Sequence, residues 1–188
     1  MNIHTIILAG GKGTRMLSQK AKVLQALGGR TMLNHVLTTA NKISNKISVV
    51  VGFDKEGVEE EIKKIGINAN TYLQKEQIGT ADAVKTTLKD IDKNEKILIL
   101  YGDVPLIKEE TLKKLCNQES DLSILTTNLE NPTGYGRALK DKENNVLGII
   151  EETDADLEQK KIKELFTGIL VTKGGVLKNF IPEIDNNN

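Results

Sequence analysis

The chain has 188 residues, an apolar fraction of 38%, and equal numbers of basic and acidic side chains, 26 of each. This length fits one domain with room for a small subdomain, and the apolar fraction argues against intrinsic disorder. A formal net charge of zero argues against a nucleic-acid binder, which would need a basic face.

The cysteine, the histidines and the hydropathy pattern argue against a disulfide, a zinc site and a membrane-spanning helix. The single Cys116 rules out an internal disulfide, so we predict a structural thiol in a reducing, cytoplasmic location. His4 and His35 are far apart, with no other Cys or His beside them, so a zinc site is not expected. Because no apolar run reaches about 18 residues, we predict no membrane-spanning helix and no membrane partner.

Strand-like and helix-like segments alternate up to about residue 127. Apolar, often β-branched runs predict strands over residues 3–8, 47–51, 69–73, 96–100 and 122–127. Helical spacing of apolar residues predicts helices over residues 32–42, 58–65, 80–89 and 108–117. Gly66 is expected to end the second of these helices and Thr80 to cap the third. The order predicts an α/β fold whose mostly parallel sheet carries helices on both faces.

The pattern changes after residue 128, where strands follow one another closely. They are predicted over residues 137–140, 146–150 and 165–172, and a helix begins at residue 176. We predict that the α/β core continues here into a more antiparallel, substrate-facing part. The chain shows no internal repeat and no linker, so we expect one domain over residues 1–188, incomplete at its C-terminal end.

The most informative segment is the glycine-rich run LAGGKGTRM at residues 8–16. It follows a predicted strand, and its glycines let the backbone approach a ligand while successive N–H groups form an anion site. Lys12, Arg15 and Lys22 add positive charge, so the segment predicts a cradle for a triphosphate. The run matches neither the Walker pattern nor the dinucleotide fingerprint. A glycine-rich turn with solvated charges is the alternative.

Arginine usage supports the phosphate interpretation. Only three of the 26 basic residues are arginine: Arg15, Arg30 and Arg137. Because lysine supplies most of the charge, an arginine indicates a need for its planar fork, which binds phosphate in a bidentate manner. Arg15 and Arg137 both stand beside glycines in candidate ligand-binding motifs.

Asp103 is the candidate metal ligand. The run YGDVP at residues 101–105 follows the predicted strand 96–100, which places Asp103 at the same sheet edge as the glycine run. Mg²⁺ prefers one or two protein carboxylates together with phosphate oxygens. The alternative is an ordinary turn aspartate.

Two further segments carry candidate ligand contacts. Gln74 has the donor and the acceptor needed to read a pyrimidine edge, and Gly79 permits close approach to a base, with simple helix capping as the alternative. The run GYGR at residues 134–137 predicts a ligand-contacting turn, and Glu151 follows a strand where it could bind sugar hydroxyls. A hairpin entrance and a solvated acidic turn are the alternatives.

These runs, in this order, resemble the N-acetylglucosamine-1-phosphate uridylyltransferase family, in particular the N-terminal pyrophosphorylase domain of the bifunctional bacterial enzymes. The most specific matches are YGDVPL at residues 101–106 and PTGYGR at residues 132–137. The resemblance implies a Rossmann-like nucleotide-diphospho-sugar transferase fold. It also implies Mg²⁺-dependent uridylyl transfer from UTP to N-acetylglucosamine-1-phosphate, with release of pyrophosphate, in cell-envelope precursor synthesis.

The resemblance further implies residue roles. Arg15 and Lys22 would be catalytic, and Asp103 would hold Mg²⁺. The nucleotide would be bound by Leu8, Ala9, Gly10, Gly11, Gly13, Thr14, Lys22, Gln74, Gly79 and Thr80. The sugar phosphate would be bound by Tyr101, Gly102, Gly136, Glu151 and Phe166.

Some positions depart from the family pattern. Phe166 stands where a sugar-contacting asparagine is usual, and Gly10 and Ala21 stand where alanine and proline are common. Gly10 and Phe166 favour an alternative, a nucleotidyltransferase for another hexose-1-phosphate. The family's second metal ligand and its β-helix acetyltransferase domain are expected to be absent. A catalytically weak nucleotide-binding fragment is therefore the other alternative, and the oligomeric state is left open.

Overall fold

The computed structural model describes residues 2–13, 18 and 20–184, which fall into two compact units. Unit 1 consists of Met1–Ser123 and Leu170–Asn188, and unit 2 consists of Ile124–Ile169. The predicted site residues Thr14 and Arg15 lie outside the described residues.

Unit 1 is built on four parallel strands in the order β5-β4-β1-β6. They are β1 (Ile3–Leu8), β4 (Lys46–Val51), β5 (Asn70–Leu73) and β6 (Lys96–Tyr101). The later part of β10 (Glu164–Lys173) pairs antiparallel with β6, with Leu170 opposite Ile99. Every residue of β1 is buried, as expected for a parallel strand covered on both faces.

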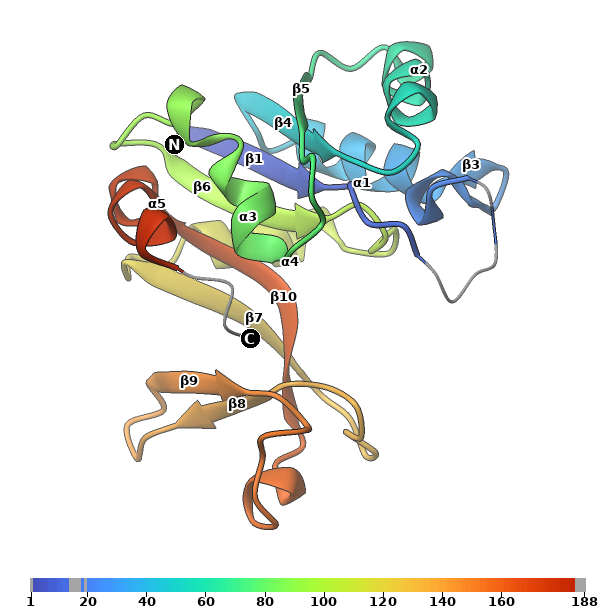
Figure 1. The fold of residues 1–188 in the computed structure, drawn as a ribbon. Coiled ribbons are helices and arrows are strands. Elements are labelled where there is room, and N and C mark those ends of the chain that lie inside the picture. Colours follow the sequence, from blue (N-terminus) through green and yellow to red (C-terminus); the bar gives the residue numbers. More distant parts are fainter. Residues whose placement is uncertain (1, 14–17, 19, 185–188) are drawn as a thin grey trace. The chain divides into compact units, whose positions relative to one another are not determined.

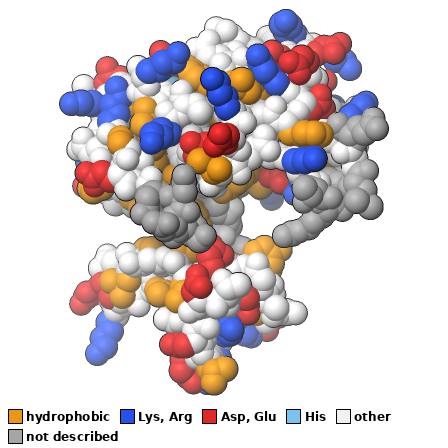
Figure 2. Space-filling model, viewed as in Figure 1, with side chains coloured by type: hydrophobic (Ala, Val, Ile, Leu, Met, Phe, Trp, Pro, Cys, Tyr) orange, Lys and Arg blue, Asp and Glu red, His pale blue; other side chains and the backbone are white. Residues whose placement is uncertain are grey.

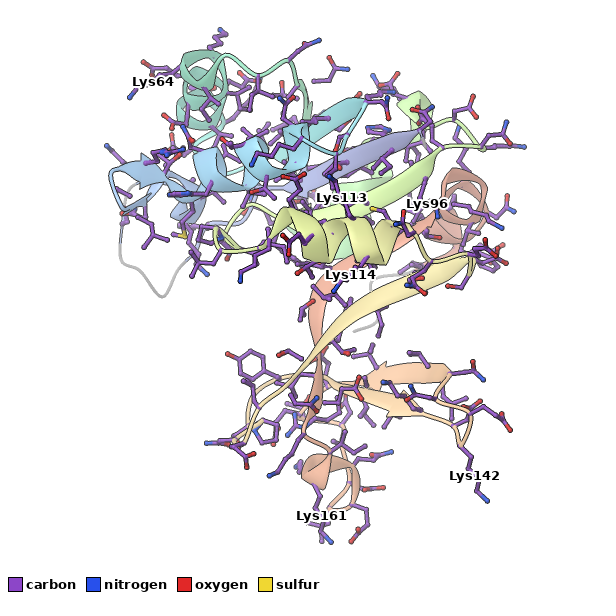
Figure 3. The ribbon with its side chains drawn as sticks, turned by 180° about the vertical axis from the view of Figure 1, so that it is seen from behind. Lys64, Lys96, Lys113, Lys114, Lys142 and Lys161 are labelled. Carbon is purple, nitrogen blue, oxygen red and sulfur yellow. The ribbon has the colours of Figure 1, made fainter. Side chains whose placement is uncertain are left out.

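Helices cover both faces of this sheet (Figures 1 and 3). α1 (Met32–Asn41) and α4 (Glu109–Cys116) lie on one face, and α3 (Thr80–Lys85) and α5 (Gly174–Phe180) lie on the other. α2 (Lys55–Ile65) packs beside α1. Because side chains alternate along a strand, Ile6 and Ile99 point to one face, where they join Val84 of α3 and Leu177 of α5 in one apolar cluster. The predicted α/β sheet with helices on both faces is confirmed.

The path of the chain creates a switch point beside β1. From β1 the chain moves outward through β4 to β5, and it then returns to β6 on the other side of β1. The carboxyl ends of β1 and β6 therefore flank the position where the strand order reverses. Ligands of open α/β sheets bind in the crevice at such positions.

Unit 2 is antiparallel, as predicted. β8 (Arg137–Lys140) pairs with β9 (Val146–Ile150), and Arg137 also lies opposite Leu165 in the first part of β10. The end of β7 (Leu122–Asn128) joins the same part of β10, where the Thr167 hydroxyl donates to the Leu125 carbonyl at 2.7 Å.

Local turn chemistry accounts for two differences from the predicted elements near α3. The helix predicted over residues 80–89 ends at Lys85, because Thr86 and Thr87 turn their hydroxyls back onto the carbonyls of Ala83 and Val84. The N-cap is Gly79 with φ of 144°, so the prediction that Thr80 caps this helix was wrong.

Glycines explain two further differences. The sequence did not reveal the short hairpin of β2 (Ala26–Leu27) and β3 (Arg30–Thr31), whose turn residues Gly28 and Gly29 have φ of 59° and 83°. α5 begins at Gly174, earlier than the predicted residue 176. A Cβ on Gly174 would lie only 2.0 Å from the Asp92 carbonyl oxygen, so the glycine permits this close packing.

Lys96 has a structural role at the start of β6. Its Nζ donates to the carbonyls of Cys116 and Gln118 at 2.7 Å each, beyond the end of α4, where Figure 3 shows it. A cation there satisfies carbonyls that the helix leaves unpaired. Burial raises the pKa of the Cys116 thiol to about 11, which fits an unreactive structural cysteine.

Basic and acidic side chains are interspersed on the face shown in Figure 2. Within the described part of the chain, no helix combines the length and apolar character needed to cross a membrane. The expectations of no nucleic-acid partner, no membrane partner and a cytoplasmic location stay predictions.

Candidate active site

A cavity of about 380 Å³ lies at the carboxyl ends of β1 and β6 in unit 1. Its walls come from the glycine run, the segment that follows it, the loop before α3 and the residues after β6. They comprise Leu8, Ala9, Gly10, Gly11, Gly13, Lys22, Val23, Gln74, Gln77, Gly79, Thr80, Ala83, Tyr101 and Asp103. Apart from Thr14, every residue predicted to bind the nucleotide therefore lines one cavity, although their roles stay predictions.

The glycine run is pressed against the end of β4. The Phe53 N–H donates to the Gly10 carbonyl at 3.0 Å, and a Cβ on Gly52 would lie only 2.7 Å from that same oxygen. A Cβ on Gly10 would lie 3.1 Å from Gln74 Oε1. A Cβ on Gly11, in contrast, would meet no described atom within 4 Å, so packing alone does not require glycine there.

Lys22 is held at the cavity wall from two sides. Its Nζ lies 2.6 Å from Oδ2 of Asp103. On the other side Gly13, with φ of 61°, backs onto the lysine stem so closely that a Cβ on Gly13 would lie 2.8 Å from Lys22 Cβ. The Lys22 side chain is 42% exposed, so its ammonium group stays accessible to a ligand in the cavity.

Asp103 offers a carboxylate suited to Mg²⁺. It lines the cavity from the turn after β6, and its side chain is 28% exposed. The described residues contain no group of three or more acidic, His or Cys side chains that could hold a metal unaided. A single carboxylate fits a Mg²⁺ ion that takes its other ligands from phosphate oxygens and water. Magnesium stays a prediction.

Gln74 is buried and shapes the loop before α3. Its Nε2 donates to the Gly79 carbonyl and to Oδ2 of Asp82, at 3.0 Å each. One amide hydrogen is therefore engaged by the loop and the other by Asp82 of α3, and Oε1 points toward Gly10. The amide can offer a ligand its oxygen more readily than the donor that the sequence also suggested.

Tyr101 and Gly102 are adjacent in the chain, but only Tyr101 lines the cavity. The Tyr101 hydroxyl lies 3.2 Å from Thr80 Oγ1, and both residues line the cavity. Gly102 is buried and does not line it. The Gly102 N–H donates to the Leu8 carbonyl at 2.9 Å, and a Cβ there would lie 2.9 Å from a Val23 methyl.

Unit 2 brings together the three residues predicted to contact the sugar there. A Cβ on Gly136 would lie 3.2 Å from Oε1 of Glu151. The Phe166 N–H donates to the Gly136 carbonyl at 3.1 Å. The Glu151 side chain is exposed, so it is available to a ligand.

Arg137 corrects the interpretation of arginine usage. Its side chain is only 1% exposed, and it donates to the carbonyls of Ile162 and Tyr135 and to the Glu152 carboxylate. With its fork engaged in this way, Arg137 stabilises unit 2 and is not the phosphate ligand that the sequence suggested. The Arg137 guanidinium, together with the Gly134 N–H, lowers the pKa of the Glu152 carboxyl.

Sequence reasoning missed three lining residues, Val23, Gln77 and Ala83. Two signals were present. Gln77 stands between Gln74 and Gly79 in the same loop, and Ala83 lies one helical turn after Thr80 and so shares its face. Val23 adjoins Lys22 but carries no polar group that would have drawn attention to it.

Comparison with known proteins agrees with this site. The model of a family described as the MobA-like NTP transferase domain matches residues 5–155. The chain belongs to this family. The matched range includes every residue that lines the cavity and most of unit 2. It supports the prediction that the protein is a nucleotidyltransferase.

Curated relatives agree with the resemblance drawn from the motifs. The chain is 44% identical to "Bifunctional protein GlmU" of Ruthia magnifica over its whole length, and 41% identical to the protein of that name from Psychrobacter cryohalolentis. The Buchnera aphidicola protein of that name is 44% identical over 99% of the chain. The chain spans about two fifths of the length of these relatives (40–42%), and the match lies in their N-terminal part. The predicted resemblance is confirmed.

A solved structure confirms the fold. A Bacillus anthracis protein described as a glucose-1-phosphate thymidylyltransferase, in complex with a sucrose, matches this NTP transferase domain with a TM-score of 0.77. The match covers 97% of this chain and 76% of that one, at 19% identity. The predicted sugar-nucleotidyltransferase fold is therefore correct.

Proposed function

We propose that this NTP transferase domain transfers a uridylyl group from UTP to N-acetylglucosamine-1-phosphate in a reaction that depends on Mg²⁺. The observation that carries the proposal is the convergence of the glycine run, Lys22 and Asp103 on one cavity at the switch point between β1 and β6. The YGDVPL and PTGYGR runs and the similarity to GlmU proteins support the choice of substrates.

In this reaction an oxygen of the sugar-1-phosphate attacks the α-phosphorus of UTP, and the bond from that phosphorus to the leaving pyrophosphate breaks. The step needs no nucleophile from the protein, so catalysis rests on alignment and on stabilising negative charge. Lys22 supplies a positive charge at the cavity wall, and free N–H groups of the glycine run would bind the phosphates. Mg²⁺, held by Asp103 when bound, would neutralise and orient phosphate oxygens.

The remaining residues select the substrates. Gln74 Oε1 and the backbone at Gly79 are suited to the base edge, since Gln74 lies beside Gly10 at the cavity and Gly79 has no side chain. In unit 2, Glu151 can accept hydrogen bonds from sugar hydroxyls beside Gly136.

The test is pyrophosphate release from UTP and Mg²⁺ with a panel of sugar-1-phosphates that includes the glucose and N-acetylglucosamine forms. We expect release with the N-acetylglucosamine form. Bound UTP without release for any sugar would contradict the proposed reaction and favour a nucleotide-binding fragment.

A second candidate, transfer to another hexose-1-phosphate, is favoured by Phe166. This residue is bonded through its main chain beside Gly136 and Glu151, and its side chain offers no hydrogen bond to an acetamido group. If this candidate is correct, the unmodified chain releases pyrophosphate more efficiently with glucose-1-phosphate than with N-acetylglucosamine-1-phosphate. Phe166→Asn then shifts the preference toward the N-acetylglucosamine form. The ratio of the two kcat/KM values measures that shift.

A further inference from the structure

Asp54 adopts a conformation that is uncommon for its residue type. It lies between the end of β4 at Val51 and the start of α2 at Lys55, and it has φ of 55° and ψ of 43°, in the left-handed region. Aspartate tolerates this region better than most residues but still less well than glycine. Asp54 also precedes α2, yet its side chain makes no capping hydrogen bond to that helix. The carboxylate therefore serves something other than the helix it precedes.

The partner of this carboxylate is the main chain next to Lys22. Oδ2 of Asp54 accepts a hydrogen bond from the Ala21 N–H at 3.0 Å. Ala21 is fully buried, with φ of −53° and ψ of 142°, and Lys22 begins the short 3₁₀ turn that follows it. The hydrogen bond fixes the peptide immediately before Lys22 and so constrains where the lysine side chain starts.

Gly57 makes room for the same carboxylate. A Cβ at this position would lie 2.5 Å from Oδ1 of Asp54. Glycine within a helix such as α2 costs stability relative to alanine. The Asp54 carboxylate is therefore accommodated by two locally unfavourable choices, its own left-handed backbone and the glycine at position 57 in the helix. Locally unfavourable choices of this kind cluster at functional sites.

We propose that Asp54 is a positioning residue that holds Lys22 at the cavity wall through the Ala21 N–H. Asp54 does not itself line the cavity. Together with Gly13 behind the lysine stem and Asp103 at the ammonium group, it gives Lys22 three constraints from three separate segments. The inference rests on the proposed function, since it assigns the constraint to phosphate binding by Lys22.

Three substitutions separate this role from a general structural one. Asp54→Gly keeps the left-handed backbone at lower cost but removes the acceptor. Asp54→Asn keeps an oxygen acceptor and also tolerates the left-handed region. Ala21→Pro accepts the observed φ but removes the donor.

UTP affinity, measured by calorimetry in the presence of Mg²⁺, gives the main readout. We expect Asp54→Gly to weaken UTP binding about tenfold, a factor that corresponds to one hydrogen bond to a charged group, while the protein stays folded. Asp54→Asn should restore most of this affinity. Asp54→Gly and Ala21→Pro remove the same hydrogen bond, one by deleting its acceptor and the other by deleting its donor. The double variant should therefore bind UTP no more weakly than the weaker of the two single variants.

A second readout is independent of nucleotide. Amide hydrogen exchange at Ala21, followed by NMR, should be slow in the wild type and in Asp54→Asn and fast in Asp54→Gly. Equal exchange rates of the Ala21 amide in wild type and Asp54→Gly would show that Asp54 does not hold this N–H group. Wild-type UTP affinity in Asp54→Gly, or additive losses in the double variant, would overturn the positioning role. A wild-type chain that binds no UTP would instead overturn the proposed function. The exchange comparison would still test the hydrogen bond between Asp54 and the Ala21 N–H.

Discussion

The Nζ atom of Lys22 lies 2.6 Å from Oδ2 of Asp103, which pairs the cation predicted to bind phosphate with the carboxylate predicted to bind metal. Both side chains are partly exposed, so solvent screens their attraction and the pair contributes little to folding stability. The pair places two opposite charges on one wall of the cavity, which is the arrangement that the proposed binding of phosphate and Mg²⁺ would require.

Replacing Lys22 by methionine should lower turnover about a hundredfold while the fold is retained, because one charged group that stabilises the developing charge is lost. Pyrophosphate release measures turnover, and circular dichroism reports the fold. Lys20→Met is the matched control, since Lys20 is an exposed lysine two positions away. Equal turnover in the two variants would remove the phosphate role of Lys22.

Asp103→Asn should raise the Mg²⁺ concentration that gives half-maximal activity by about tenfold or more, because an amide is a poorer ligand for a hard cation than a carboxylate. Binding of Mn²⁺ together with UTP, followed by electron paramagnetic resonance, checks the same point without turnover. Glu110→Gln, an exposed carboxylate on α4, provides the control. An unchanged metal requirement would assign the metal to other groups.

Gly13→Ala should lower the free energy of unfolding by about 1–3 kcal/mol, the usual effect of forcing a side chain into filled space. Its φ of 61° disfavours alanine, and the new Cβ would meet Lys22 Cβ at 2.8 Å. Gly11→Ala is the control, because a Cβ there meets no described atom within 4 Å, and its stability should change by less than about 0.5 kcal/mol. Urea unfolding measures both, and equal effects would contradict the packing at Gly13.

His4 should make stability depend on pH in the range below neutrality. Its side chain is fully buried, with Nε2 2.7 Å from Ser48 Oγ and Nδ1 3.3 Å from Glu95 Oε2. Burial, reinforced by Lys46, lowers the pKa of His4, and the smaller opposing effects of Glu95 and Asp90 do not reverse this. The folded protein therefore keeps His4 neutral at pH values where the unfolded chain, with a His pKa of about 6.5, binds a proton.

Because the unfolded chain binds the extra proton, the stability from His4 is complete above about pH 6.5 and is lost as the pH falls toward the lower pKa of the folded state. Urea unfolding between pH 7.5 and pH 5.5 should show this decrease, limited to about 1.4 kcal/mol per pH unit for one proton. In His4→Gln the decrease over this range should largely disappear. The same slope in both proteins would show that other groups are responsible.

Short-range features of the sequence were sufficient for much of this outcome. The alternation of apolar runs predicted the four parallel strands of unit 1, because burial on both faces selects continuous apolar strands. The glycine run and Asp103 were placed at one edge because the carboxyl ends of parallel strands share that edge. Each of these inferences uses local periodicity or a rule of sheet topology, so no long-range contact had to be known.

The errors arose where a distant partner decides what a side chain does. Arg137 looked like a phosphate ligand beside its glycines, but the fold gives it Glu152 and the Ile162 carbonyl and buries it. Gln74 kept its predicted place at the cavity, yet Asp82 and Gly79 take both of its amide hydrogens.

The sequence by itself determined the fold class, the sheet edge that carries the site and most residues of the cavity, because hydrophobic periodicity and turn chemistry act over a few residues. Only the tertiary structure decided which charges are paired and which backbone groups are anchored. The link from Asp54 to the Ala21 N–H joins segments 33 residues apart, and that from Lys22 to Asp103 joins segments even further apart. Such pairings depend on how the strands are ordered in space, which no local pattern encodes.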